Sequence, residues 1–180
     1  LNLLRVIGCG VEIKTKSKDM VPFDLDALRW NKIIICTDAD KDGYHIRTLL
    51  LTLFRRLLPT LLREKKVFIA ESPLYEIVCK DKSYFAYDEA EKAQLLRQLE
   101  GQKYKVSRSK GLGENEPEMM RQTTMNPATR RLISVTPADE AETDRIFETL
   151  LGDDIAARKA FITEYGPQYM SEIDRSGDDA

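Results

Sequence analysis

The feature that most constrains the fold is an apolar run that passes directly into an acidic one. Residues 33–35 are all isoleucine, and Asp38, Asp40 and Asp42 follow at alternate positions, with Gly43 directly after them. Consecutive β-branched residues predict a buried strand of a parallel sheet. Because carboxylates are not buried without partners, we expect these acids at the carboxyl end of that strand, where open α/β sheets bind ligands.

The spacing of the three carboxylates predicts a metal site. Acids at i, i+2 and i+4 on a tight turn offer the hard oxygen ligands that Mg²⁺ prefers. One alternative is an EF-hand loop, but this loop needs a glutamate six positions after its glycine, and Leu49 stands there. A second alternative is a solvated turn in which Asp42 caps the next helix, which accounts for one acid but not for three.

The rest of the chain alternates between helical and strand patterns. Helical spacing predicts one amphipathic helix over about 45–64, with a kink at Pro59, and 67–70 reads as a second buried strand that completes a βαβ unit. Further expected elements are a hairpin of 75–79 and 83–87, a helix capped by Asp88, a strand over 104–108, a helix from Pro117 to Thr123, a strand over 132–135, a helix from Pro137 to Leu151 and a helix over 155–165.

Composition excludes several classes of protein. The chain has 42% hydrophobic and 32% charged residues, as globular proteins do, and its formal charge of −2 argues that any DNA contact is local. Its three cysteines form no CxxC pair, and we interpret Cys36 as a core residue of the first strand. We expect a cytoplasmic protein with no membrane span. Residues 1–10 resemble a helix without its beginning, which predicts that the chain is part of a longer protein.

Four ordered motifs resemble a known family. They are residues 37–50 (TDADKDGYHIRTLL), 69–75 (IAESPLY), 110–114 (KGLGE) and 123–132 (TTMNPATRRL). Together they resemble the TOPRIM region of type IIA DNA topoisomerases, in the B-subunit form found in bacterial gyrase and topoisomerase IV. The resemblance covers nearly the whole chain. It implies an α/β fold: a TOPRIM (Rossmann-like) parallel sheet flanked by helices in residues 1–125, without its N-terminal part, then an α+β tail in residues 126–180.

The resemblance also implies roles for individual residues. Asp38 corresponds to a ligand shared by two Mg²⁺ sites, Asp40 to the second-site ligand and Asp42 to a third acid that often acts through water, with Mn²⁺ or Ca²⁺ able to substitute. Arg47 and Lys110 are expected to meet DNA phosphates. No residue of this chain is expected to be catalytic itself, because the family's glutamate would lie upstream of Leu1 and its tyrosine on the A subunit.

The implied function is that of an ATP-dependent topoisomerase subunit. The resemblance predicts double-stranded DNA and a gyrase A subunit as partners, in an A2B2 heterotetramer, with ATP bound in an upstream domain. The B subunit of topoisomerase IV is the close alternative. A primase or nuclease of the TOPRIM type would lack the Gly-Leu-Gly-Glu and Thr-Thr-Met-Asn-Pro blocks, and a receiver domain would not carry this run of three aspartates.

Overall fold

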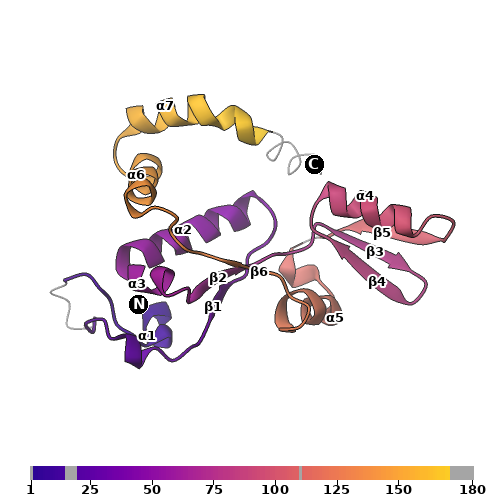
Figure 1. Ribbon diagram of the computed structural model, residues 1–180, viewed down its shortest axis with the longest axis horizontal. Helices are drawn as coiled ribbons and strands as arrows, with labels where there is room; N and C mark the ends of the chain where they lie inside the picture. The colour runs from indigo at the N-terminus through magenta and orange to yellow at the C-terminus, as the bar shows by residue number, and fades with distance from the viewer. Residues whose placement is uncertain (1, 15–19, 110, 171–180) are drawn as a thin grey trace. The chain divides into compact units, whose positions relative to one another are not determined.

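The computed structural model describes residues 2–14, 20–109 and 111–170. The chain forms two compact units, each built from separate stretches of sequence (Figure 1). The first comprises Leu1–Leu28, Leu51–Lys65 and Thr136–Ala180, and the second comprises Arg29–Leu50 and Lys66–Val135. The second unit carries both sheets and the acidic run, so it positions the candidate site.

The first sheet of this unit has strand order β1-β2-β6. Its strands are β1 (Ile33–Ile35), β2 (Val67–Ala70) and β6 (Leu132–Ser134). β1 and β2 run parallel, with Ile33 opposite Val67, whereas β6 is antiparallel to β2. The predicted α/β class and the parallel pair are confirmed, and β6 makes the sheet mixed. Ile35, Val67 and Ile69 are buried, while Ile33 and Ile34 are half-buried because β1 pairs with one strand only among the described residues.

The expected long helix is two helices, α2 (Lys41–Leu57) and α3 (Pro59–Arg63). α2 begins earlier than predicted because Asp40 Oδ1 accepts a hydrogen bond from the Gly43 N–H at 2.7 Å, the pattern of an N-cap. It ends where Leu58 leaves the helical region, with φ −144° and ψ 45°. Pro59 has no N–H to continue α2 but suits the first position of α3. The chain is therefore broken here and not merely kinked.

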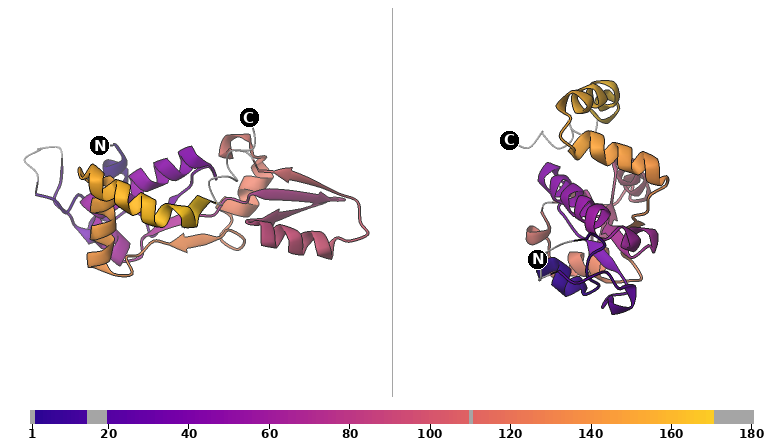
Figure 2. Two further views of the ribbon diagram at one scale, coloured as in Figure 1. Left: turned by 90° about the horizontal axis from the view of Figure 1, so that it is seen from above. Right: turned by 90° about the vertical axis from the view of Figure 1, so that its left-hand side faces the viewer.

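The second sheet has order β4-β3-β5 and is antiparallel throughout. The strands β3 (Tyr75–Cys79), β4 (Lys82–Ala86) and β5 (Tyr104–Arg108) confirm the predicted hairpin and strand. α4 (Glu89–Gln98) lies along one face of this sheet in two views (Figures 1 and 2). Its cluster has a buried centre and half-buried neighbours: Ile77, Cys79, Leu99, Tyr84, Leu95, Leu96 and Val106.

The predicted cap of α4 is confirmed, with one difference. Asp88 Oδ1 accepts from the Glu91 N–H at 2.7 Å, as a capping box requires. The Glu91 carboxylate does not return to Asp88 but accepts from the Tyr87 N–H at 3.2 Å and from Arg131 at 2.6 Å. Glu91 thus ties the start of α4 to the segment that leads into β6.

Three short helical turns connect the two sheets. They are the 3-10 turn η2 (Leu112–Glu114), the helix α5 (Pro117–Met120) and the π-helical turn η3 (Arg121–Met125). The predicted helix from Pro117 to Thr123 is therefore real but changes its winding after Met120. Thr123 and Thr124 are buried, and the Thr123 hydroxyl donates to the Met119 carbonyl at 2.8 Å.

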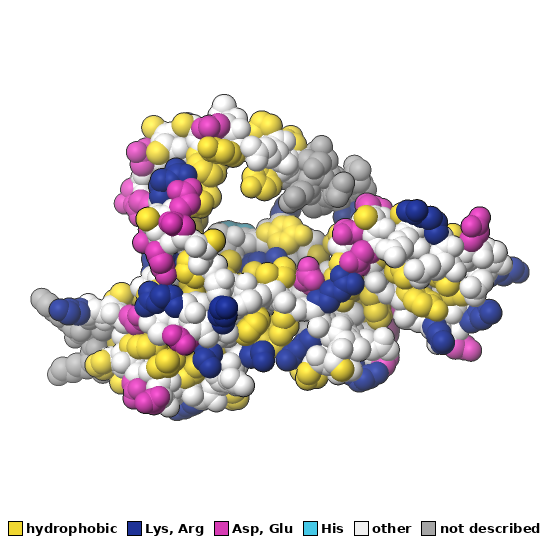
Figure 3. Space-filling view, viewed as in Figure 1, with side chains coloured by type: hydrophobic (Ala, Val, Ile, Leu, Met, Phe, Trp, Pro, Cys, Tyr) yellow, Lys and Arg dark blue, Asp and Glu magenta, His cyan; other side chains and the backbone are white. Residues whose placement is uncertain are grey.

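The first unit is helical in its described residues and has its own core. Its elements are α1 (Asn2–Ile7), η1 (Leu25–Ala27), the second half of α2, α3, α6 (Glu140–Leu151), α7 (Ile155–Tyr165) and η4 (Gly166–Tyr169). Its buried apolar side chains are Ile7, Cys9, Val11, Phe54, Leu58, Leu61 and Leu62. Pro137 precedes α6, which Asp139 caps by accepting from the Glu142 N–H at 2.7 Å. Acidic side chains gather over α6 (Figure 3).

Two further expectations concern single residues and membrane spans. The interpretation of Cys36 as a core residue was wrong, because β1 ends at Ile35 and the Cys36 side chain is exposed. All three cysteines are free. Across the described ranges, the helices are too short or too polar to cross a membrane.

Candidate metal and DNA site at the end of strand β1

Asp38 lies at the point where two distant motifs meet. It follows β1 by three residues and is half-buried. Its Oδ1 accepts a hydrogen bond from the Leu112 backbone N–H at 2.7 Å, across 74 residues of sequence. The segment after the Gly111 position thus closes over the acidic run, as two of the four motifs would require if they served one site.

Two glycines make this close approach possible. A Cβ on Gly43 would lie 2.1 Å from the Asp38 carbonyl oxygen, and a Cβ on Gly111 would lie 3.1 Å from Asp38 Oδ2. Neither glycine is required by a positive φ, since the recorded positive φ angles belong to other glycines. Both are needed because a side chain would collide with Asp38.

The other two carboxylates have different surroundings. Asp40 is exposed and caps α2 through Oδ1, while Asp42 is exposed within the first turn of α2. Because α2 starts at Lys41, the alternation of an extended chain does not continue to Asp42. No three His, Cys, Asp or Glu side chains in the described part of the chain lie close enough together to hold a metal ion. The metal site therefore stays a prediction.

Thr37 anchors the backbone before Asp38. It is a buried polar residue, 6% exposed, whose hydroxyl accepts a hydrogen bond from Arg47 Nη2 at 3.3 Å. Its carbonyl accepts from the Ser72 hydroxyl at 3.4 Å. Ser72 belongs to the motif that follows β2, so the ends of both parallel strands contribute to the position of Asp38.

Arg47 faces a small cavity beside the acidic run. Its Nε is buried and has no hydrogen-bond partner among the described residues, and its guanidinium carbon lies 5.2 Å from the centre of the Tyr44 ring. The cavity measures about 150 Å³ and is lined by Ala39, Tyr44, Arg47, Ile69, Glu71, Ser72, Leu74, Tyr87 and Ile133. An unpaired N–H of a cation inside a cavity is a place where an anion would be stabilised.

Tyr87 forms one wall of this cavity and is held by Arg131. The Arg131 guanidinium carbon lies 3.9 Å from the ring centre of Tyr87. Burial raises the pKa of Tyr87, against the opposing effect of the Arg131 charge. The phenol is therefore neutral at ordinary pH and can donate or accept a hydrogen bond. Lys110, the second predicted DNA contact, lies outside the described residues.

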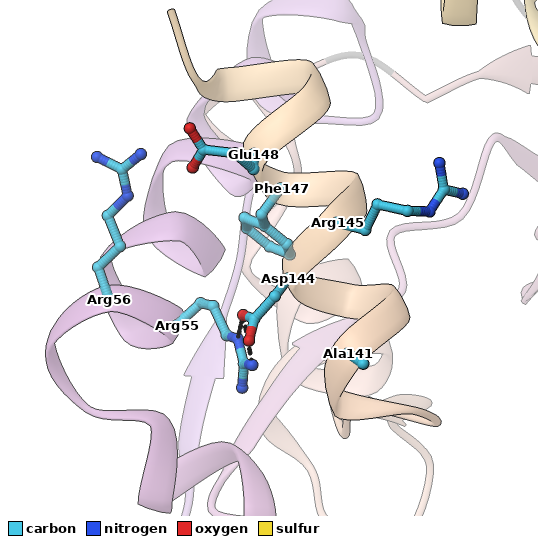
Figure 4. A pocket seen from close by; sticks show the side chains of 7 residues that line it. All are labelled: Arg55, Arg56, Ala141, Asp144, Arg145, Phe147 and Glu148. Atoms are coloured by element: carbon cyan, nitrogen blue, oxygen red, sulfur yellow. Dashed lines mark hydrogen bonds and ion pairs between the residues drawn. The ribbon is translucent and has the colours of Figure 1, made fainter.

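A larger groove lies elsewhere, between the last turns of α2 and α6 (Figure 4). Its volume is about 630 Å³, and its lining residues are Arg55, Arg56, Ala141, Asp144, Arg145, Phe147 and Glu148. Arg55 is already paired with Asp144, and the remaining charges are of both signs. The groove shares no residue with the acidic run, so its size does not make it the candidate site.

Comparison with known proteins identifies both motif regions. A Toprim domain model matches residues 2–72, and a model for the carboxyl terminus of the DNA gyrase B subunit matches residues 101–163. The DNA gyrase B subunit of Thermotoga maritima is 47% identical over 152 residues, which are 84% of this chain and 24% of that protein. The chain belongs to the DNA gyrase B-type Toprim family.

Two further relatives support this assignment. The DNA gyrase B subunit of Thermus thermophilus is 48% identical over 143 residues, 79% of this chain and 23% of that protein. The DNA topoisomerase 4 B subunit of Mycoplasma capricolum is 43% identical over 163 residues, 91% of this chain and 24% of that protein. The chain thus spans about a quarter of the length of the curated relatives it matches.

Sequence reasoning missed the groups that hold Asp38 in place. The Leu112 N–H is a backbone group, which no residue type announces, although the two glycines around Leu112 suggested a close approach of the backbone. Thr37 and Ser72 stood inside motifs of the Toprim family but were given no role. Their polar side chains at the ends of two buried strands were the available signal.

Proposed function

We propose that this chain is the metal-binding part of the B subunit of an ATP-dependent type IIA DNA topoisomerase of the gyrase type. In this proposal it supports Mg²⁺-dependent cleavage and religation of both DNA strands together with an A subunit, and so changes DNA supercoiling. The observation that carries the proposal is the hydrogen bond between Asp38 and the Leu112 N–H. It joins the acidic motif to the glycine motif at the carboxyl end of two parallel strands, where such sheets bind ligands.

The donor groups at this edge suit a hard divalent cation. Asp38 and Asp40 each use Oδ1 for a backbone N–H, and the second oxygen of each makes no hydrogen bond with another described residue. Carboxylate oxygens are the ligands that Mg²⁺ prefers, and its usual water shell would let the more distant Asp42 act through water. Mn²⁺ and Ca²⁺ would substitute. When bound, the cation would supply electrostatic stabilisation to the oxygen that leaves phosphorus.

The residues of this chain would hold the cation and the DNA backbone, and the covalent step would belong to other groups. We assign the attacking tyrosine to the A subunit and a further carboxylate ligand to a glutamate outside this chain. Arg47 would donate its unpaired Nε to a phosphate oxygen, and Lys110 would contribute a second positive charge. Such contacts fix the register of DNA and do not read its sequence.

The remaining parts of the proposal concern the whole protein. Residues 1–125 would form the Toprim domain and 126–180 its tail. ATP would bind in a domain outside this chain. The complete enzyme would be a cytoplasmic A2B2 heterotetramer acting on double-stranded DNA. These features follow from what the curated relatives are named, the gyrase B subunit above all.

The test is plasmid cleavage by the complete subunit combined with its A partner. Asp38→Ala and Asp40→Ala should abolish Mg²⁺-dependent cleavage while leaving the circular dichroism spectrum unchanged, and Asp42→Ala should give a smaller loss. Asp81→Ala is the matched control, because Asp81 is an exposed aspartate at the β3–β4 turn. Full cleavage by both Asp38→Ala and Asp40→Ala would refute the metal assignment.

The B subunit of topoisomerase IV is the second candidate, because a protein of that name is 43% identical to this chain. The two functions differ in product and not in the cleavage step. The complete enzyme should introduce negative supercoils into relaxed plasmid if it is a gyrase. Efficient decatenation of linked circles without negative supercoiling would favour topoisomerase IV.

A further inference from the structure

We infer that the backbone N–H of Leu112 is a positioning group for the metal, acting through Asp38. It orients the Asp38 carboxylate so that Oδ2 is the oxygen presented to a divalent cation. This inference rests on the proposed metal function and goes beyond it, because it gives the Gly-Leu-Gly segment a defined chemical role. The argument starts from what each oxygen of Asp38 touches.

The two carboxylate oxygens of Asp38 are not equivalent. Oδ1 accepts from the Leu112 N–H at 2.7 Å, a short hydrogen bond of the charge-assisted kind. Oδ2 lies on the side of Gly111, where a Cβ would approach to 3.1 Å. The Leu112 N–H therefore engages one oxygen and leaves the other beside a residue that has no side chain to cover it.

The Leu112 N–H is free to make this contact. Leu112 is the first residue of the turn η2, so its N–H is not used by the hydrogen bonds of the turn itself. Gly111, before it, has φ −58° and ψ 153°, an extended conformation that any residue adopts. Glycine is thus required at position 111 for its proximity to the carboxylate and not for its backbone angles.

Asp40 shows the same division of labour. Its Oδ1 accepts from the Gly43 N–H at 2.7 Å, so in each of the two acids one oxygen is held by a backbone donor. Groups that orient a ligand in this way typically change metal affinity by about 10- to 100-fold when they are removed. For Asp38 the donor comes from a segment 74 residues away, so closure of that segment and metal affinity should be coupled.

Leu112→Pro removes the N–H with little other change. Proline suits the first position of a helical turn, and an extended residue such as Gly111 suits the position before proline. Leu112→Ala is the matched control, because it shortens the side chain and keeps the N–H. The readout is Mn²⁺ binding to the complete subunit without DNA or ATP, measured from the electron paramagnetic resonance signal of free Mn²⁺.

We expect Leu112→Pro to weaken Mn²⁺ binding by about 10- to 100-fold, and Leu112→Ala to stay within about twofold of the parent protein. Equal affinity of the two variants overturns the inference. Asp38→Ala separates this outcome from a failure of the proposed function. If Asp38→Ala loses Mn²⁺ binding while Leu112→Pro keeps it, the metal site stands and the positioning role falls. If Asp38→Ala keeps it, the metal site itself is refuted.

A second pair of variants covers the case in which Leu112→Pro does not fold. Gly111→Ala would push against Asp38 Oδ2, whereas Gly113→Ala would meet nothing within 4 Å. Gly111→Ala should weaken Mn²⁺ binding and Gly113→Ala should not, and equal binding by both overturns the inference. In metal-free protein, amide exchange at Leu112 should accelerate in Asp38→Ala but not in Asp38→Asn, which keeps an acceptor oxygen. Unchanged exchange in Asp38→Ala also overturns it.

Discussion

Arg55 on α2 and Asp144 on α6 form a two-point ion pair, with Nε at 2.9 Å and Nη2 at 2.5 Å from the same carboxylate oxygen. Nη1 of Arg55 also contacts Glu140 at 2.5 Å. The Arg55 side chain is only 9% exposed. One guanidinium therefore joins the end of α2 to the first turns of α6 (Figure 4).

Arg55→Ala should loosen α6 from α2. Hydrogen bonds to charged groups contribute about 1.5–3 kcal/mol, so the free energy of unfolding should fall by about this amount. Arg55→Lys should recover only part of the loss, because lysine cannot present two parallel N–H donors. Urea denaturation checks this, with Arg56→Ala as the control because Arg56 is exposed. Equal stability of the two alanine variants would contradict the assigned role of Arg55.

Gly43→Ala should damage the candidate site even though the change is one methyl group. The new Cβ would lie 2.1 Å from the Asp38 carbonyl oxygen, so the loop between β1 and α2 must shift. Overpacking of this kind costs about 1–3 kcal/mol. Thermal unfolding measures the cost, and Mn²⁺ binding by the complete subunit reports the displacement of Asp38. Gly113→Ala, which meets nothing within 4 Å, should leave both unchanged.

The sequence predicted most elements correctly because their apolar periodicity is strong, as in β2, the β3–β4 hairpin and α4. Boundaries were less predictable where several residues could serve as the cap. Asp40 caps α2 although Asp42 was also available, and Asp139 caps α6 although Pro137 suggested an earlier start. Local patterns do not decide between such neighbours, since the choice depends on where the preceding strand ends.

The candidate site was predictable only in part. The acidic run and its place after β1 could be derived from residue types, because buried strands and unpaired acids do not mix. The contact of Asp38 with Leu112 could not, because it joins a backbone group to a side chain 74 residues away. The exposed position of Cys36 was missed for a simpler reason: the strand is one residue shorter than the apolar run suggests.

Glu118 should titrate well below other glutamates. Its hydrogen bond from Arg121, followed by that from Gln122, lowers its pKa from the ordinary 4.5 to about 2. Because the folded pKa is the lower one, the stabilising contribution of this pair is fully present above about pH 4.5 and is lost as pH falls through about 2. Carbon NMR of the Glu118 carboxyl measures the midpoint. Arg121→Gln should move that midpoint back toward 4.5, and an unmoved midpoint would show that the pair is absent in solution.

Arg47→Ala should weaken DNA binding by the complete enzyme without changing sequence preference. Arg47 is the half-buried cation whose Nε has no partner among the described residues, so its proposed contact is with a phosphate. Loss of one phosphate contact should lower the slope of log affinity against log salt by about 1. Fluorescence anisotropy with labelled duplexes over a salt series measures that slope. Arg56→Ala removes an exposed arginine further along α2 and should leave it unchanged. If both variants lower the slope equally, α2 attracts DNA by its overall charge and the specific role of Arg47 is lost.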